Sequence, residues 1–155
     1  MSINIRKAET KDLPSIYALV KELALYEQAP HEPSITVEEF VQDGSGDTPR
    51  FQAILAEKNG QTIGGAVYYH GYSTWKGKII YLDDIVVNES YRKQGIGTLL
   101  FKKLLQITQE LQVNQLRWHV LDWNHPAIKF YKKINASLDE HWITCKIEKD
   151  GLYIN

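Results

Sequence analysis

The chain has 155 residues, of which 43% are hydrophobic and 24% charged, and its 18 Lys and Arg against 19 Asp and Glu leave a net charge of −1. This length predicts a single domain over residues 1–155. The composition excludes collagen-like, coiled-coil and disordered classes. The absence of a cationic surplus argues against a nucleic-acid partner, and no segment has the ~18 apolar residues that a membrane span needs.

Cysteine usage and the N-terminal sequence predict a cytoplasmic protein. Cys145 is the single cysteine, so no internal disulfide can form, which is compatible with a reducing compartment. The N-terminal residues contain no apolar run typical of a secretion signal. Because Cys145 lies in the alternating run Trp142–Ile147, we expect a thiol within a strand or the core.

The first half of the chain reads as a strand, two helices and a hairpin. Thr10 is the expected N-cap of the first helix, whose apolar residues recur at helical spacing, and Thr36 with Glu39 predicts a capping box for the second. Asn59-Gly60 is a strong signal for a tight hairpin turn. The predicted elements are a strand at 3–6, helices at 11–26 and 37–43, and strands at 51–57 and 62–72.

The second half alternates strands and helices. The predicted elements are strands at 78–87, 115–121 and 140–147 and helices at 98–112 and 126–134. The order β-α-α-β-β-β-α-β-α-β predicts an α/β fold with a mixed, mostly antiparallel twisted sheet and helices on both faces. The β-α-β segment from Ile79 to Leu121 should be a parallel, right-handed crossover.

A strand, a basic glycine-containing turn and a helix follow one another between Asp84 and Gly97. A helix N-terminus attracts anions, glycines let a phosphate approach the backbone, and Arg92 and Lys93 add positive charge. The alternative is a glycine turn that only begins a helix. A dinucleotide fingerprint would need glycine at Leu100, and a P-loop would need a Lys-Ser/Thr pair after Gly97. The candidate phosphate-binding residues are Arg92, Lys93, Gln94, Gly95, Ile96, Gly97 and Thr98.

The pattern Arg92-x-x-Gly95-x-Gly97 resembles the acetyl-CoA pyrophosphate loop of the GNAT superfamily of N-acetyltransferases. Further segments, from Ile5 to about Ile147, are similar to the diamine acetyltransferase family, which contains spermidine/spermine and thialysine acetyltransferases. They are residues 21–27, 72–78, 81–84, 120–124 and 130–132, and residues 73–77 and 121–124 look closer to the thialysine type. The resemblance implies a GNAT-like fold, acetyl-CoA as co-substrate, direct transfer to a small cationic amine in a ternary complex, and a homodimer.

The resemblance also implies the residues that contact acetyl-CoA. Tyr131 occupies the position of the tyrosine that protonates the sulfur of CoA, and a phenol can donate that proton. Ile85, Val86 and Val87 would offer main-chain groups to the pantetheine arm, and Asn124 with Ala127 matches a second CoA-contacting turn. Asn135 replaces a family glycine; asparagine tolerates the left-handed conformation at a helix end, so the helix should still end there.

The amine side is implied in the same way. Asp83 matches the carboxylate that binds the amine and accepts its proton, directly or through water, although the family more often has Glu there. Tyr26 and Glu27 match a polyamine-contacting pair, and Trp75 could add an aromatic face for a cation. Because successive side chains on a strand point to opposite faces, we expect only one of Asp83 and Asp84 to serve the site.

Two other functions stay open at this point. The chain could acetylate a protein lysine or N-terminus, which would need an open groove, or it could be a catalytically silent acetyl-CoA-binding module. The presence of Tyr131 argues against the silent module. The histidines show no metal-ligand spacing, so we expect no metal site.

Overall fold

The computed structural model describes residues 2–153, which form two compact units that divide between His119 and Val120. The first unit carries the sheet and most helices, and the second carries one α-helix and the C-terminal segment. Each unit is described by itself below. No helix among the described residues is both long and apolar enough to cross a membrane.

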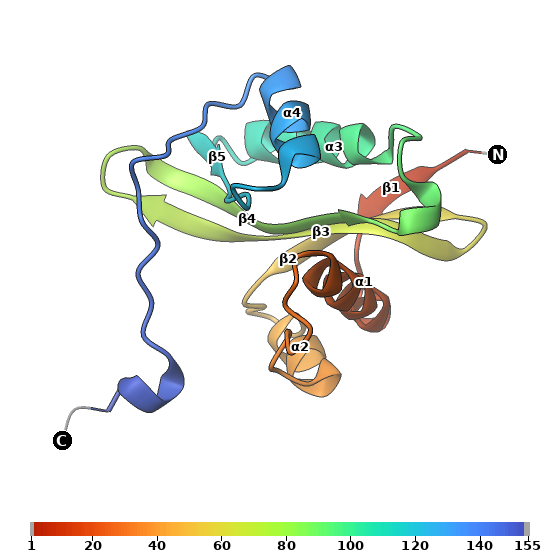
Figure 1. Cartoon of the computed structure of the whole chain (residues 1–155). Coiled ribbons are helices and arrows are strands. Elements are labelled where there is room, and N and C mark those ends of the chain that lie inside the picture. The colour runs from red at the N-terminus through yellow and green to blue at the C-terminus, as the bar shows by residue number, and fades with distance from the viewer. Residues whose placement is uncertain (1, 154–155) are drawn as a thin grey trace. The chain divides into compact units, whose positions relative to one another are not determined.

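The first unit is built on a five-stranded sheet in the order β1-β2-β3-β4-β5 (Figure 1). The strands are β1 (Asn4–Lys7), β2 (Gln52–Lys58), β3 (Gln61–Ser73), β4 (Gly77–Val87) and β5 (Gln115–Arg117). The first four pair antiparallel, whereas β4 and β5 are parallel. The mixed, mostly antiparallel sheet and the parallel crossover are therefore confirmed.

Helices cover both faces of this sheet, as expected. Helices α1 (Leu13–Tyr26) and α2 (Val37–Asp43) lie on one face, and α3 (Ile96–Glu110) lies on the other (Figure 1). Ile16 of α1 is buried in a cluster with Leu55 of β2 and Val67 of β3. Leu100 and Leu104 of α3 have no exposed surface, so burial of apolar area on both faces stabilises the layers.

Two local signals in the sequence form the predicted structures. Asn59 and Gly60 both have positive φ, 53° and 76°, as a two-residue type I′ hairpin turn requires. At the start of α2, the Glu39 N–H donates to Thr36 Oγ1 at 3.1 Å, and the Thr36 N–H donates to Glu39 Oε2 at 2.7 Å. Both signals involve neighbours in sequence, so short-range interactions favour them.

The start of the first α-helix differs from the prediction. A 3₁₀ turn over Thr10–Asp12 comes first, and α1 begins at Leu13, so Thr10 is not its N-cap. Asp12 organises this turn by accepting from the Glu9 N–H at 2.8 Å and from both terminal nitrogens of Arg6 at 2.7 and 3.0 Å. The ion pair with Arg6, six residues earlier in the chain, thus holds Asp12, the residue directly before α1.

Two further boundaries are corrected by the structure. Helix α3 begins at Ile96 rather than at Thr98, so Gly97 lies inside the first turn. Strand β5 ends at Arg117 rather than at Leu121, because only Gln115–Arg117 pair with Ile79–Tyr81 of β4.

The second unit contains α4 (His125–Lys133) and a 3₁₀ turn (Lys149–Gly151). Asn135 follows α4 with φ of 65°, which confirms the left-handed helix end. The expected strand at 140–147 is wrong: no strand forms there among the described residues, and Cys145 is exposed. Alternating apolar residues make a strand only where a neighbouring strand offers free backbone groups, and Trp142 and Ile143 stay 71% and 87% exposed.

Candidate active site

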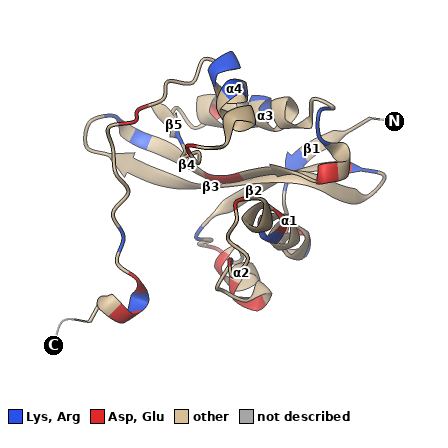
Figure 2. Ribbon diagram, viewed as in Figure 1, with Lys and Arg blue, Asp and Glu red and all other residues tan. Residues whose placement is uncertain are grey.

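An irregularity in β4 places two consecutive carboxylates together. Val67 of β3 lies opposite Asp84 and the next residue, Tyr68, lies opposite Leu82, so Asp83 is an extra residue on β4. Such a β-bulge interrupts the alternation of side chains between the two faces. The carboxyl groups of Asp83 and Asp84 lie close enough to share a hydrogen bond when one of them is protonated, which corrects the expectation that they point to opposite faces. Figure 2 shows this acidic stretch in the middle of the sheet.

Glu27, directly after the last residue of α1, belongs to the same acidic group. Burial, together with the nearby charges of Asp83 and Glu27, raises the pKa of Asp84 from 3.8 to about 7. Burial also raises the pKa of Asp83 and of Glu27, and the charge of Asp83 adds to the effect on Glu27. These shifts mean that the three carboxyl groups lack sufficient positive partners of their own, so a cationic ligand would be stabilised among them.

Three rings border the carboxylates, and none of them was a predicted site residue. Tyr69 of β3 lies opposite Tyr81 of β4 with ring centroids 5.1 Å apart. The Tyr81 ring is 5.7 Å from that of His119, and the Tyr81 hydroxyl is hydrogen-bonded to His119 Nδ1. Burial and then the charge of Asp83 raise the pKa of Tyr69, and burial raises that of Tyr81.

Of the three rings, only Tyr81 could have been placed near Asp83 from the sequence. Tyr81 precedes Asp83 by two positions, the spacing of side chains on one face of a strand. The partners Tyr69 and His119 follow only from the register of β3 on β4 and of β5 on β4. We refer to Glu27, Tyr69, Tyr81, Asp83, Asp84 and His119 as the acidic-aromatic cluster.

The loop between β4 and α3 has the geometry of an anion site. Gly95 is the N-cap of α3 with φ of 79°, a left-handed conformation that favours glycine. It has no side chain to cap the helix, so the N–H groups of the first turn can donate to a bound anion. A Cβ added at Gly95 or Gly97 would meet no atom within 4 Å, so both glycines border open space. A phosphate group fits this arrangement.

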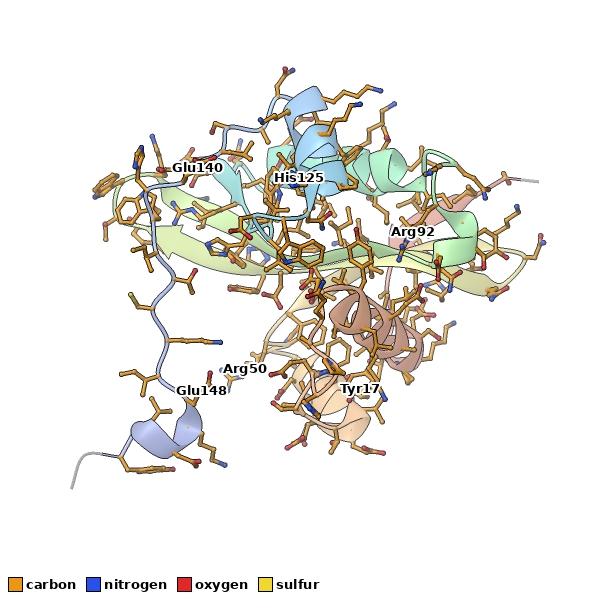
Figure 3. The ribbon with its side chains drawn as sticks, viewed as in Figure 1. Tyr17, Arg50, Arg92, His125, Glu140 and Glu148 are labelled. Carbon is orange, nitrogen blue, oxygen red and sulfur yellow. The ribbon has the colours of Figure 1, made fainter. Side chains whose placement is uncertain are left out.

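Arg92 connects this loop to α1 (Figure 3). Its Nε donates to the carbonyl of Val87 at 3.1 Å, and its guanidinium lies 5.2 Å from the centre of the Tyr26 ring. Glu22 of α1 is 3.9 Å from the Arg92 guanidinium, and it also accepts from Asn88 Nδ2 at 3.2 Å and from the Glu89 N–H at 3.0 Å. Glu22 is a further residue that sequence analysis missed.

The pairing between β4 and its parallel neighbour β5 ends within the site. The ladder with β5 ends at Tyr81 and Arg117, whereas pairing with β3 continues to Val87. Residues 82–87 therefore have one strand neighbour in the described part of the chain. An extended ligand arm could use the free edge of Ile85–Val87 as another strand would.

Trp75 is not brought to the cluster, and three other predicted residues belong to the second unit. Trp75 lies in the turn between β3 and β4, is 81% exposed, and is separated from Asp83 by about 20 Å of strand. Asn124, Ala127 and Tyr131 belong to the second unit, where Asn124 caps α4 by accepting from the Ala127 N–H at 3.4 Å. Tyr131 of α4 is 8% exposed.

In the described residues, no group of three or more His, Cys, Asp or Glu is placed to hold a metal ion. The site as built combines carboxylates, rings and a helix N-terminus. This arrangement could accommodate a cation beside Asp83 and Asp84 of β4 and an anion in the loop that follows the same strand.

The raised pKa of Asp84 predicts the pH dependence of folding. Because folding favours the protonated carboxyl, the stability that this group contributes at acidic pH is lost as pH rises from about 4 to about 7. Asp84→Asn should therefore raise the free energy of unfolding by roughly 2 to 4 kcal/mol at pH 8, and by much less at pH 4. Urea unfolding at both pH values measures this.

The matched control is Asp47→Asn, at an exposed position in the loop after α2. It should leave the free energy of unfolding unchanged at both pH values. Equal stability of the Asp84→Asn and wild-type proteins at pH 8 would contradict a desolvated carboxyl at position 84.

Comparisons with known proteins agree with this geometry. The chain is 35% identical to a thialysine N-epsilon-acetyltransferase of Mus musculus, covering 97% of this chain and 95% of that one. It is 39% identical to the Bos taurus protein of the same name, covering 86% and 84%. It is also 35% identical to a human spermidine/spermine N(1)-acetyltransferase-like protein 1 over 96% of this chain, which spans 23% of that longer relative.

Solved structures share the fold. An integron cassette protein of V. cholerae matches with a TM-score of 0.80 at 25% identity, over 98% of this chain and 96% of that one. An aminoglycoside acetyltransferase from an uncultured soil metagenomic sample matches with a TM-score of 0.78 at 17% identity, over 94% and 95%. The model of the acetyltransferase (GNAT) family matches residues 13–136. The chain therefore belongs to the GNAT acetyltransferase family and is an acetyltransferase that acts on amines.

Proposed function

We propose that this enzyme transfers the acetyl group of acetyl-CoA to a primary amine of a small cationic molecule, by direct transfer in a ternary complex. The observation that carries the proposal is that β4 holds two carboxylates at Asp83 and Asp84 and ends, at Val87, in the loop of a helix N-terminal anion site. One strand thus presents a cation site and an anion site in a row, as a cationic amine and a phosphate-bearing acetyl donor require.

The acidic-aromatic cluster supports the amine as acceptor. An ammonium group among Asp83, Asp84 and Glu27 would offset the desolvation that raises the pKa of these carboxyls. The faces of Tyr69 and Tyr81 can add cation–π attraction. A small molecule with more than one amine, such as a polyamine or a lysine-like molecule, is bound more tightly when more than one carboxylate is present.

The anion loop supports acetyl-CoA as donor. The residues that would hold its pyrophosphate are Arg92, Lys93, Gln94, Gly95, Ile96, Gly97 and Thr98, with Ile85, Val86 and Val87 along the pantetheine arm and Asn124 and Ala127 as a second contact. The open space at Gly95 and Gly97 fits a phosphate group. The bound donor supplies the thioester carbonyl that the amine attacks.

The reaction moves three protons. The ammonium loses one before the amine attacks, because an alkylammonium such as that of lysine has a pKa of about 10.4. As the carbon–sulfur bond breaks, the sulfur gains a proton, which we assign to the hydroxyl of Tyr131. The nitrogen, now bonded to the acetyl carbon, loses its second proton, which restores the Tyr131 hydroxyl, so that one proton leaves to solvent for each acetyl group transferred. Asp83 orients the amine, and the resemblance to the family implies Asp83, or a water beside it, as the acceptor of the first proton.

The relatives narrow the acceptor class. The names of the Mus musculus and Bos taurus proteins specify the epsilon amine of thialysine, a lysine analogue, and that of the human protein specifies polyamines. We therefore place a lysine-like amine first and a polyamine second. Because the family model runs from residue 13 to residue 136, across the boundary between the two units, we further propose that the chain works as one domain. The homodimer and the cytoplasmic location stay predictions.

The experiment that tests the function is acetyl-CoA turnover with an amine panel. The panel contains thialysine, lysine, spermidine, putrescine and a lysine-containing peptide. Highest kcat/KM for one of the small amines supports the proposal. Highest kcat/KM for the peptide would replace it with protein acetylation, and bound acetyl-CoA without turnover of any amine would leave a binding module.

Tyr131→Phe tests the acid. We expect kcat to fall about 100-fold or more, because a positioned general acid contributes 10²–10⁴-fold, while the affinity for acetyl-CoA stays close to that of wild type. Steady-state kinetics and calorimetric titration of acetyl-CoA measure the two quantities. Tyr72→Phe, at a side chain that is 75% exposed, is the control and should retain full kcat. An unchanged kcat in Tyr131→Phe would remove this residue from the mechanism.

Gly97→Ala tests whether Gly97 is required for acetyl-CoA binding rather than for folding. Alanine favours a helix by up to about 1 kcal/mol over glycine, and its Cβ meets no atom within 4 Å, so thermal stability should hold or rise. The same methyl group occupies space that a phosphate would use, so the Kd for acetyl-CoA should rise at least ~10-fold, about 1.4 kcal/mol. Gln109→Ala, at the far end of α3, should change neither quantity. Unaltered affinity in Gly97→Ala would place the pyrophosphate elsewhere.

A further inference from the structure

One interaction in the acidic-aromatic cluster has no part in the scheme above. The hydroxyl of Tyr81 is hydrogen-bonded to Nδ1 of His119, and the two rings are 5.7 Å apart at an angle of 57°. The pairing depends on the end of β5: Tyr81 lies opposite Arg117, the last residue of the strand, and His119 follows two residues later. The chain thus brings an imidazole to a tyrosine that stands two residues before Asp83.

We propose that Tyr81 and His119 form the relay that accepts the proton of the substrate ammonium, with Tyr81 as the group that contacts the amine and His119 as the final acceptor. The inference rests on the proposed acetyl transfer to a cationic amine. It replaces Asp83 as proton acceptor and leaves Asp83 as the carboxylate that anchors the ammonium.

The transfer balances in protons and charge. The ammonium N–H bond breaks as a new O–H bond forms on the Tyr81 hydroxyl, whose own O–H bond breaks as its proton bonds to Nδ1 of His119. The ammonium becomes a neutral amine with a free electron pair, and the imidazole becomes an imidazolium. Imidazole is suited to the final position because it exchanges protons near neutral pH.

Charged groups lie near both members of the pair. Asp83 interacts electrostatically with Tyr81 and with His119, Asp84 interacts with Tyr81, and Glu27 lies close to Asp83. Tyr69 of β3 packs against Tyr81. Arg117 of β5 also interacts with Tyr81, and its guanidinium is held by Gln115 Oε1 at 2.8 and 3.0 Å.

The carboxylates are less suited to accept the proton. Asp83 and Asp84 interact closely with each other, and the negative charge of the pair is needed to balance the positive charge of the amine. A proton moved onto Asp83 would remove the charge that holds the substrate. A proton moved onto His119 keeps a cation beside Asp83, so the site retains its electrostatic balance.

His119→Asn is the discriminating variant. The amide oxygen of Asn can accept the Tyr81 hydrogen bond at about the position of Nδ1, yet it cannot take up a proton. Wild type, His119→Asn and Tyr81→Phe are compared on the best small amine of the panel from pH 6 to pH 10. His70→Gln is the control, since His70 alternates with Tyr69 on β3 and thus points to the other face.

We expect kcat/KM of His119→Asn and of Tyr81→Phe to fall about 100-fold at pH 7. The loss should shrink as the pH approaches the pKa of the substrate ammonium, about 10.4, because the amine is then already neutral in solution. The Kd for acetyl-CoA and the thermal midpoint should stay as in wild type, and His70→Gln should match wild type throughout. Wild-type kcat/KM and pH profile in His119→Asn would overturn the relay. A loss that is equal at all pH values would instead show a role in positioning alone, which also overturns it.

A second measurement does not depend on turnover. In protein with ¹⁵N-labelled histidine, the His119 signals, identified by their loss in His119→Asn, should shift in Tyr81→Phe, whereas the other histidines should not. Unshifted His119 signals would overturn the pair itself. If the wild type acetylates no amine while the signals do shift, the proposed function fails and the hydrogen-bonded pair stands without a catalytic role.

Discussion

The site depends on the divided pairing of β4. This strand is hydrogen-bonded to β3 from Gly77 to Val87 but to β5 over only three residues. Because each strand must satisfy its backbone groups, a strand that loses one neighbour offers a free edge to a ligand. In the proposed function, an extended donor arm would lie along this free edge, which begins after Tyr81 and is next to the carboxylates at positions 83 and 84.

The bulge at Asp83 gives this strand its chemistry. In regular pairing, consecutive residues would face opposite layers, and one carboxyl would lie against the apolar core. The extra residue instead lets both carboxyls meet, at the cost of like-charge repulsion and desolvation that raise the pKa of Asp84 to about 7. A protein optimised only for stability would not keep this arrangement, and such local strain is typical of functional sites.

Helix α1 connects the two parts of the site through its C-terminal end. Tyr26 lies against the guanidinium of Arg92, while Glu27, the next residue, belongs to the acidic-aromatic cluster. One turn earlier, Glu22 holds Asn88, Glu89 and Arg92 of the loop after β4. Charges that cancel to −1 over the chain are thus separated within a short distance of β4 into an acidic cluster and a basic loop.

The acetyltransferase family, the mixed sheet, the Asn59-Gly60 hairpin and the glycine loop at Gly95 could all be predicted from the sequence, because they rest on local conformational preferences and contiguous motifs. The pairing of Asp83 with Asp84, and of Tyr81 with Tyr69 and His119, could not, because each depends on strand register and on one inserted residue. The alternation of apolar and polar residues at 140–147 wrongly predicted a strand, because no neighbouring strand is present there among the described residues. The order of the residues sets which side chains are available for the chemistry. Which of them meet depends on the fold, since hydrogen bonds between strands distant in sequence set those distances.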